Sequence, residues 1–290
     1  MRDPDQYDDV AEVFARYSER AVFPITACLL EMTGLSIGQW VLDVACGSGM
    51  LTRAAAAVVG ASGRAIGIDL SPGQIRVATS RSRQQGYHWN EFSLMDALRL
   101  GFANDSFDVV VAQFPHLPDR ERCLAEMFRV LKPGGTFAIC NGGGGAAAWP
   151  LAQAPLQAEI AAGGVIDGLF WLCLSEHFPH LIAQPAGNAP VVRDDPHVAL
   201  RNELEQAGFG EICLWSYAYT APFESAEEAF EWESVRTSAY RMAQSALNPA
   251  SVVVFKRDYL RKAQVKRDQY GLLGITTAAL FGMGYKPVRD

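Results

Sequence analysis

The sequence predicts an α/β fold in which buried, mostly parallel strands alternate with helices, and three observations support this fold class. An apolar strand at 41–44 leads into a glycine loop at 45–49, and a helical segment follows. One helix length later, a second buried strand, Ala65–Asp69, ends in an acid, as expected for a strand, helix and strand unit. Two further apolar strands, 107–113 and 136–140, flank an amphipathic helix.

Length, composition and charge restrict the class of protein. The chain has 290 residues, of which 49% are hydrophobic, and this is enough for a sizeable core. A formal net charge of −7 argues against non-specific nucleic-acid binding. No apolar run approaches the ~20 residues that cross a bilayer, and the N-terminal residues are polar and acidic. We therefore expect a soluble cytoplasmic protein without a nucleic-acid or membrane partner.

The glycine loop is the expected ligand site. Gly47 and Gly49 allow positive φ and close approach of a ligand to the backbone, while the helix start offers free N–H groups. Asp43, at the end of the first strand, would repel a pyrophosphate but suits a cationic amino acid group. The dinucleotide fingerprint is incomplete, because Leu51-Thr52 stands where its third glycine would fall. These features indicate S-adenosylmethionine as the ligand.

Residues 43–49, Asp-Val-Ala-Cys-Gly-Ser-Gly, resemble the first motif of class I S-adenosylmethionine-dependent methyltransferases. The resemblance is to the branch with the ubiquinone and menaquinone biosynthesis C-methyltransferases and many small-molecule methyltransferases. Further motifs, including 102–113 and 129–135, extend it over residues 40 to 140. It implies a Rossmann-like, seven-stranded, mostly parallel sheet with helices on both faces and a helical substrate cap. It also implies that the last strand, 275–285, is antiparallel.

The resemblance assigns cofactor contacts residue by residue. Asp69 matches the acid that holds the ribose diol, and the alternative is a simple loop acid or helix cap. Asp96 matches the residue that accepts the adenine amino group, and the alternative is a turn-forming Asp. The remaining expected contacts lie in the glycine loop, around the adenine and at the end of the fourth strand, at Asp43, Ala45, Gly47, Gly49, Leu70, Gln74, Ala97 and Gln113.

Two residues are candidates for catalysis. His116 follows the fourth strand and could act as a general base, or it could have a structural or substrate-orienting role. Tyr17 lies on a predicted N-terminal helix, where it could enclose the cofactor and help remove a proton, or simply pack. A dedicated base is optional, since a sulfonium is already an activated leaving group.

No metal site or disulfide framework is predicted. His177 and His180 stand beside Glu176, but Pro179 disrupts the helical spacing and no second ligand cluster follows. The six cysteines are scattered and contain no Cys-x-x-Cys pair. We expect them to be reduced core residues.

We expect N-terminal cap helices at residues 1–36 and a cofactor-binding core at 37–145. Two lid insertions are expected at 146–195 and 224–268, and the rest of the core sheet at 196–223 and 269–290. Pro24 is expected to open the second of two N-terminal helices. Aromatic and apolar residues in the lid favour a hydrophobic acceptor, although they could instead form a dimer interface or extra core. A basic run at 256–267 indicates a solvated helix face or a contact with an anionic substrate tail.

The predicted function is methyl transfer from S-adenosylmethionine to a small hydrophobic acceptor. O- or C-methylation of a quinone, polyketide or terpenoid-like natural product in secondary metabolism fits the predicted lid. The alternative is a cyclase or pericyclase that binds the cofactor without transferring methyl, since fold does not fix function. A nicotinamide-dependent oxidoreductase is disfavoured by Asp43 and by the missing third glycine. A homodimer is left open.

Overall fold

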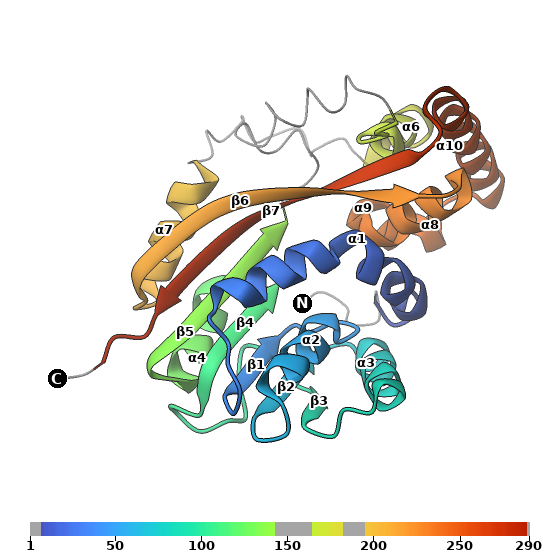
Figure 1. The fold of residues 1–290 in the computed structure, drawn as a ribbon. Helices are drawn as coiled ribbons and strands as arrows, with labels where there is room; N and C mark the ends of the chain where they lie inside the picture. The colour runs from blue at the N-terminus through green and yellow to red at the C-terminus, as the bar shows by residue number, and fades with distance from the viewer. Residues whose placement is uncertain (1–6, 143–163, 182–194, 289–290) are drawn as a thin grey trace.

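The computed structural model describes residues 7–142, 164–181 and 195–288. Its seven strands form one sheet in the order β3-β2-β1-β4-β5-β7-β6 (Figure 1). The first five strands are parallel to one another, whereas β7 is antiparallel to both β5 and β6. The strands are β1 Trp40–Val44, β2 Arg64–Asp69, β3 Asn90–Leu94, β4 Phe107–Gln113, β5 Leu131–Gly142, β6 Gly210–Phe223 and β7 Leu273–Tyr285. The predicted Rossmann-like, seven-stranded, mostly parallel sheet and its antiparallel last strand are confirmed, and the helical substrate cap stays a prediction.

Helices lie on both faces of this sheet (Figure 1). The α-helices of the described residues are α1 Ala11–Met32, α2 Met50–Val59, α3 Pro72–Gln85, α4 Arg120–Val130, α6 Leu169–His177, α7 Pro196–Gln206, α8 Ala226–Arg236, α9 Ser238–Ala243 and α10 Pro249–Tyr270. None of the described helices is both long enough and apolar enough to span a bilayer. Of the expected lid insertion at 146–195, only residues 164–181 and 195 lie within the described part of the chain.

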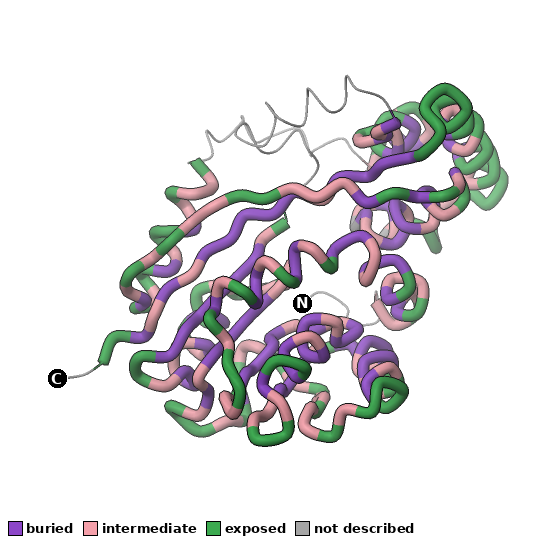
Figure 2. The backbone as a smooth tube through the Cα atoms, viewed as in Figure 1, coloured by how far each residue is buried: buried purple, intermediate pink, exposed green. Residues whose placement is uncertain are grey.

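The two faces of the sheet bury separate apolar cores. Alternate residues of a strand point to opposite faces, so Val41 and Val109 join the core under α1 and α2, while Leu42 joins the core under α4 and α7. The central strands are buried along most of their length (Figure 2). Burial on both faces explains why these strands are continuous apolar runs in the sequence.

The predicted pair of N-terminal helices is wrong, because α1 is one helix with Pro24 inside it. A proline within a helix removes one backbone hydrogen bond and tends to kink it. Here the buried positions continue across Pro24, from Ala15 and Ala21 on one side to Ile25 and Leu29 on the other. We infer that burial of this continuous face outweighs the lost bond.

The segment between Ser225 and Asn248 comprises α8, α9 and a short 3-10 turn. Ser225 caps α8, since its hydroxyl accepts a hydrogen bond from the Glu228 N–H at 3.1 Å. The far ends of β6 and β7 extend beyond β5, and α6, α8, α9 and α10 gather there (Figure 1). These helices share an aromatic cluster, made of Phe170, Phe230, Tyr240, Phe255 and Tyr259.

A lysine after β7 completes the C-terminus of α4. The Lys286 side chain is only 8% exposed, and its Nζ donates to the carbonyl oxygens of Phe128 at 2.9 Å and Leu131 at 2.6 Å. It also pairs with the Asp105 carboxylate at 2.6 Å. The last carbonyls of a helix have no partner within the helix, so a cation here satisfies acceptors and complements the helix dipole.

Replacing this lysine should therefore destabilise the fold. We expect Lys286→Met to lower the free energy of unfolding by about 2–3 kcal/mol, because buried carbonyls lose their donor. Urea denaturation at neutral pH measures the change. Lys266→Met, on the exposed surface of α10, serves as the matched control. Equal stabilities of the two variants would contradict the assigned role.

Candidate cofactor and acceptor site

Several of the predicted cofactor residues gather at one edge of the sheet. Asp43, Asp69 and Gln113 lie at or next to the carboxyl ends of β1, β2 and β4. These three strands are parallel neighbours, so their carboxyl ends meet on the same edge. The glycine loop leaves β1 at this edge, and Gly49 forms the N-cap of α2.

Asp69 holds the glycine loop and the following turn together. Its Oδ2 accepts the Gly47 N–H at 2.8 Å, and its Oδ1 accepts the Ser71 N–H at 2.9 Å. Burial raises the pKa of Asp69, against the opposing effect of these backbone donors. Each carboxylate oxygen can accept more than one hydrogen bond. Asp69 can therefore organise the loop and still accept hydrogen bonds from two ligand hydroxyls.

Asp43 is a buried acid with one oxygen left over. Its side chain is 2% exposed, and its Oδ2 accepts the Thr52 hydroxyl at 2.6 Å. Its Oδ1 is buried and has no hydrogen-bond partner among the described residues. Burial raises the pKa of Asp43 to about 7. A cationic donor from a ligand would satisfy this oxygen and stabilise its charge, so the residue fits the amino acid part of S-adenosylmethionine.

The two glycines of the loop do different work. A Cβ at Gly47 would meet only the Gln74 Oε1 within 4 Å, at 3.9 Å, so a ligand can approach this backbone. A Cβ at Gly49 would lie 2.6 Å from the Phe92 ring and 2.8 Å from the Ala78 Cβ. At Gly49 the missing side chain therefore allows close packing as well as positive φ, and a ligand contact with its backbone stays a prediction.

Gln74, an expected cofactor contact, lies in the first turn of α3. The Ser71 hydroxyl caps this helix by accepting the Gln74 N–H at 3.2 Å. The Gln74 side chain does not return to the Ser71 N–H, because that donor is taken by Asp69. The Gln74 Oε1 is instead buried without a hydrogen-bond partner among the described residues. It lies on the open side of Gly47, where a ligand donor could reach it.

The predicted adenine contacts follow β2 and β3. Leu70 is 45% exposed, which leaves an apolar surface next to Asp69. Asp96 is exposed, and its Oδ1 accepts the Leu98 N–H at 2.9 Å, so it does form a turn. Ala97 is half-buried beside it. The turn uses only one oxygen of Asp96, and the adenine contacts of these residues stay predictions.

The carboxyl ends of β1 and β4 carry unusual backbone conformations. Ala45 and Phe114 have φ angles of 60° and 50°, in the left-handed region that side chains disfavour. Such conformations persist where the surroundings enforce them, and they cluster at functional sites. Next to Phe114, the Gln113 Oε1 accepts the Thr26 hydroxyl of α1 at 2.9 Å. The strand end that should line the methyl-transfer centre is thus fixed by α1.

The two catalytic candidates lie in different surroundings. Tyr17 is buried, its hydroxyl donates to the Glu231 Oε2 at 2.6 Å, and burial followed by this hydrogen bond raises its pKa. Its ring packs near Phe223, so the structure favours the packing role. The His116 ring instead lies 5.7 Å from the Tyr7 ring, measured between centroids.

The sequence did not point to Tyr7 and its neighbour Asp8, which reach this edge from the N-terminus. The Asp8 Oδ1 accepts the Ser71 hydroxyl and, at 2.7 Å, the Gly73 N–H, so it caps the start of α3. A Cβ at Gly73 would lie 2.6 Å from the Asp8 Cα, which explains the glycine at this position. No local sequence pattern predicts a contact between Asp8 and the start of α3, because the two segments are far apart in the sequence.

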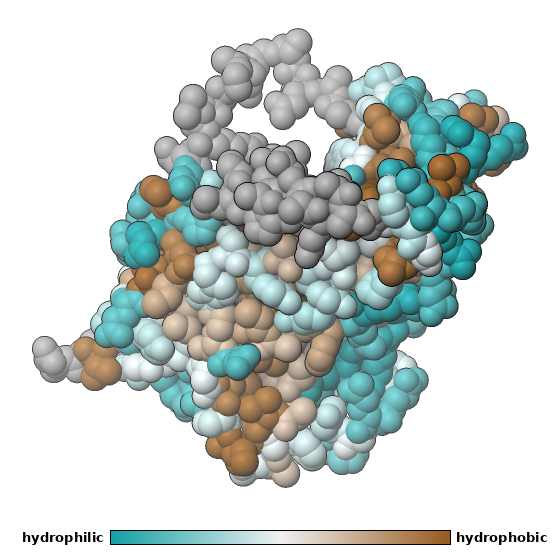
Figure 3. All heavy atoms as spheres, turned by 45° about the horizontal axis from the view of Figure 1, so that its top comes forward, coloured by the Kyte–Doolittle hydropathy of each residue, from teal (hydrophilic) through white to brown (hydrophobic). Residues whose placement is uncertain are grey.

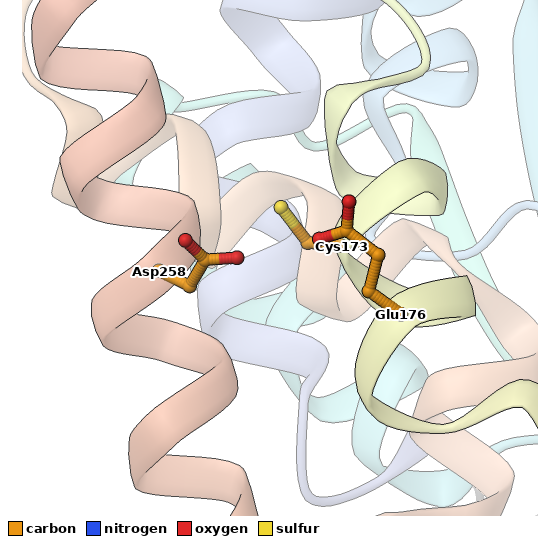
Figure 4. A group of neighbouring side chains, drawn as sticks. All are labelled: Cys173, Glu176 and Asp258. Carbon is orange, nitrogen blue, oxygen red and sulfur yellow. The ribbon is translucent and has the colours of Figure 1, made fainter.

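One group of side chains resembles a metal site but already holds a cation. Ligand atoms of Cys173, Glu176 and Asp258 lie within 4.8 Å of one another between α6 and α10 (Figure 4). The Lys262 Nζ is 2.5 Å from the Glu176 Oε2 and 2.9 Å from the Asp258 Oδ2. His177 completes the cluster, at 3.2 Å from Asp258. We assign the cluster to helix packing.

The structure divides the basic run at 256–267. Lys262 is half-buried in the cluster just described, whereas the other five basic residues are exposed. They make much of the outer surface at this end of the molecule hydrophilic (Figure 3). The expected solvated helix face therefore describes most of the run.

Comparison with known proteins agrees with this geometry. Residues 41–135 match the family described as "Methyltransferase domain". Methyltransferase GfsG of Streptomyces halstedii is 37% identical over 142 residues, which are 48% of this chain and 48% of that protein. The ubiquinone/menaquinone biosynthesis C-methyltransferase UbiE of Hydrogenovibrio crunogenus is 34% identical over 113 residues, 38% of this chain and 44% of that protein. The chain thus spans about half the length of these curated relatives, or less.

Solved structures share the fold. The [4+2]-cyclase SpnF superposes with a TM-score of 0.54 and 22% identity, covering 92% of this chain and 82% of that one. Phosphoethanolamine N-methyltransferase 2 of Haemonchus contortus, in complex with S-adenosylmethionine, gives a TM-score of 0.55 with 16% identity, covering 99% and 60%. At these identities the likeness extends to the fold alone. The family match and the curated relatives identify a methyltransferase domain over residues 41–135 of this chain.

Proposed function

We propose that the protein transfers methyl from S-adenosylmethionine to an oxygen or carbon of a small hydrophobic acceptor, such as a quinone, polyketide or terpenoid-like molecule. The buried Asp43 carboxylate carries the proposal, because its Oδ1 has no partner among the described residues and it stands on β1, the strand that leads into the glycine loop. Relatives named as quinone methyltransferases and as GfsG support this acceptor class. A cytoplasmic location and a homodimer stay predictions.

The cofactor, when bound, supplies a methyl group on an activated sulfonium. The residues of the chain then have to bind the cofactor and the acceptor, orient the accepting atom toward the methyl group, and exclude water. Asp43 holds the amino acid end, Asp69 holds the ribose, and Gly47 allows the ligand to lie against the loop. His116, after β4, is the candidate to accept a proton from an acceptor hydroxyl or an acidic carbon.

Calorimetric titration with S-adenosylmethionine and S-adenosylhomocysteine is the first test. We expect both to bind, and the mass of the product then reports the reaction with phenolic and quinol acceptors. Methyl transfer adds one methylene to the acceptor. The alternative, a cyclase or pericyclase, leaves the product mass unchanged. The [4+2]-cyclase SpnF, which shares this fold, supports that alternative. Failure of the folded protein to bind either ligand would remove the basis of both proposals.

A further inference from the structure

Arg241, on α9, has a buried donor that the described residues do not use. Its Nη1 donates to the Val235 carbonyl oxygen, but its Nε is buried without a hydrogen-bond partner among the described residues. Among the described residues, no carboxylate forms an ion pair with Arg241. Buried polar groups are nearly always hydrogen-bonded, and an unused guanidinium N–H is costly.

Other arginines of the protein show what normally fills this position. In Arg236 and Arg129, Nε and Nη2 donate side by side to the two oxygens of Glu233 and Glu126, at 2.7 to 2.9 Å. This edge of the guanidinium matches a carboxylate in a bidentate geometry. Since Nη1 of Arg241 is already engaged, the edge formed by its Nε and Nη2 is the one left to receive an anion.

Arg241 is close to the expected reaction centre. Its guanidinium carbon lies 4.1 Å from the centroid of the Tyr7 ring, which in turn lies 5.7 Å from the His116 ring. The guanidinium is thus within about 10 Å of the imidazole that follows β4. A cation–π contact with the Tyr7 ring does not supply the carboxylate that fills this position in Arg236 and Arg129. A small acceptor could reach from one group to the other.

We propose that Arg241 binds an anionic group of the acceptor, a carboxylate or a phosphate, and so places the reacting atom beside His116. The proposal rests on the proposed function and adds a charge to the acceptor class. It also distinguishes Arg241 from the exposed basic residues of α10, which have solvent around them. Tyr7 acts as a positioning residue, because its ring lies against the guanidinium of Arg241.

The test uses three naphthalene probes of similar size: 2-naphthoate, 2-naphthyl phosphate and methyl 2-naphthoate. Binding of each to the full chain is measured calorimetrically, with and without S-adenosylhomocysteine. We expect at least one of the two anions to bind about tenfold or more tighter than the neutral ester. The two anionic probes distinguish a carboxylate site from a phosphate site.

Substitutions test whether Arg241 causes the preference for the anionic probes. Arg241→Gln should abolish the preference for the anion, and Arg241→Lys should retain part of it, since it keeps the charge but loses the bidentate edge. Arg201→Gln, on the exposed side of α7, is the matched control and should bind like the wild type. Thermal unfolding checks that each variant is folded.

Two results would overturn the inference: equal binding of acid, phosphate and ester by the wild type, or an anion preference that survives in Arg241→Gln. Failure to bind S-adenosylhomocysteine contradicts the proposed function instead. Binding of the three probes measured without S-adenosylhomocysteine still tests the anion site. Failure of the anion site and failure of the proposed function are therefore distinguishable.

Discussion

Replacing Asp69 with alanine is expected to weaken S-adenosylhomocysteine binding by at least about a hundredfold. The change removes the proposed acceptor for two ribose hydroxyls and also leaves the N–H groups of Gly47 and Ser71, which organise the loop, without their acceptor. Hydrogen bonds to a charged group contribute about 1.5–3 kcal/mol each, and a hundredfold corresponds to about 2.7 kcal/mol. Calorimetric titration of the variant beside the wild type measures the loss.

Asp108→Ala is the matched control for this substitution. Asp108 also accepts a backbone N–H, from Trp40 at 2.8 Å, and pairs with Lys132 at 2.7 Å. It lies at the opposite, amino-terminal edge of the sheet. We expect this variant to lose stability while its affinity stays within about threefold of the wild type. If both variants bind equally weakly, the effect of Asp69 is general loosening of the fold, and the ribose assignment fails.

The second large effect concerns Asp43 and pH. Burial raises its pKa to about 7, above the usual value of an unfolded chain, so the folded protein holds an extra proton between about pH 4 and 7. Stability without ligand should therefore fall as pH rises through this window, by up to about 1.4 kcal/mol per unit. Asp43→Asn should remove this component. Denaturation of both proteins from pH 4 to 8 provides the comparison.

Cofactor binding should have the opposite dependence. A cationic amino acid group prefers ionised Asp43, so S-adenosylmethionine affinity in the wild type should rise from pH 5 to about 7. In Asp43→Asn we expect binding about tenfold or more weaker at pH 7, and nearly independent of pH in this range. A variant that is more stable at pH 8 yet binds as well as the wild type would show that Asp43 does not contact the ligand.

Local patterns predicted the strands and the acids that end them. Buried parallel strands are apolar on both faces, so β1 and β2 could be recognised in the sequence. One strand, helix and strand unit separates Asp43 in β1 from Asp69 at the end of β2, so the placement of both acids at this edge also followed from the sequence. Features set by tertiary packing did not follow. Pro24 normally marks a helix boundary, and only burial on both sides of it explains the continuous α1.

The acceptor side of the site was the least predictable part. Tyr7, His116 and Arg241 come from three distant segments, and none of them belongs to a pattern with fixed spacing. The packing role of Gly49 did not follow from the sequence either, because a glycine required for a ligand and a glycine required for packing look the same in a sequence. The contact with Phe92 that separates these cases exists only once the sheet is formed.

The position of β7 has a consequence for how the protein is made. This strand lies between β5 and β6, and Thr136 of β5 pairs with Tyr285 near its end. During synthesis, β1 to β5 can pair in the order in which they leave the ribosome, but β6 has no neighbour until β7 has also emerged. Contacts so distant in sequence form slowly and expose strand edges meanwhile. A nascent chain halted before Leu273 should therefore be a client of chaperones and proteases, because the sheet can be completed only after β7 has emerged.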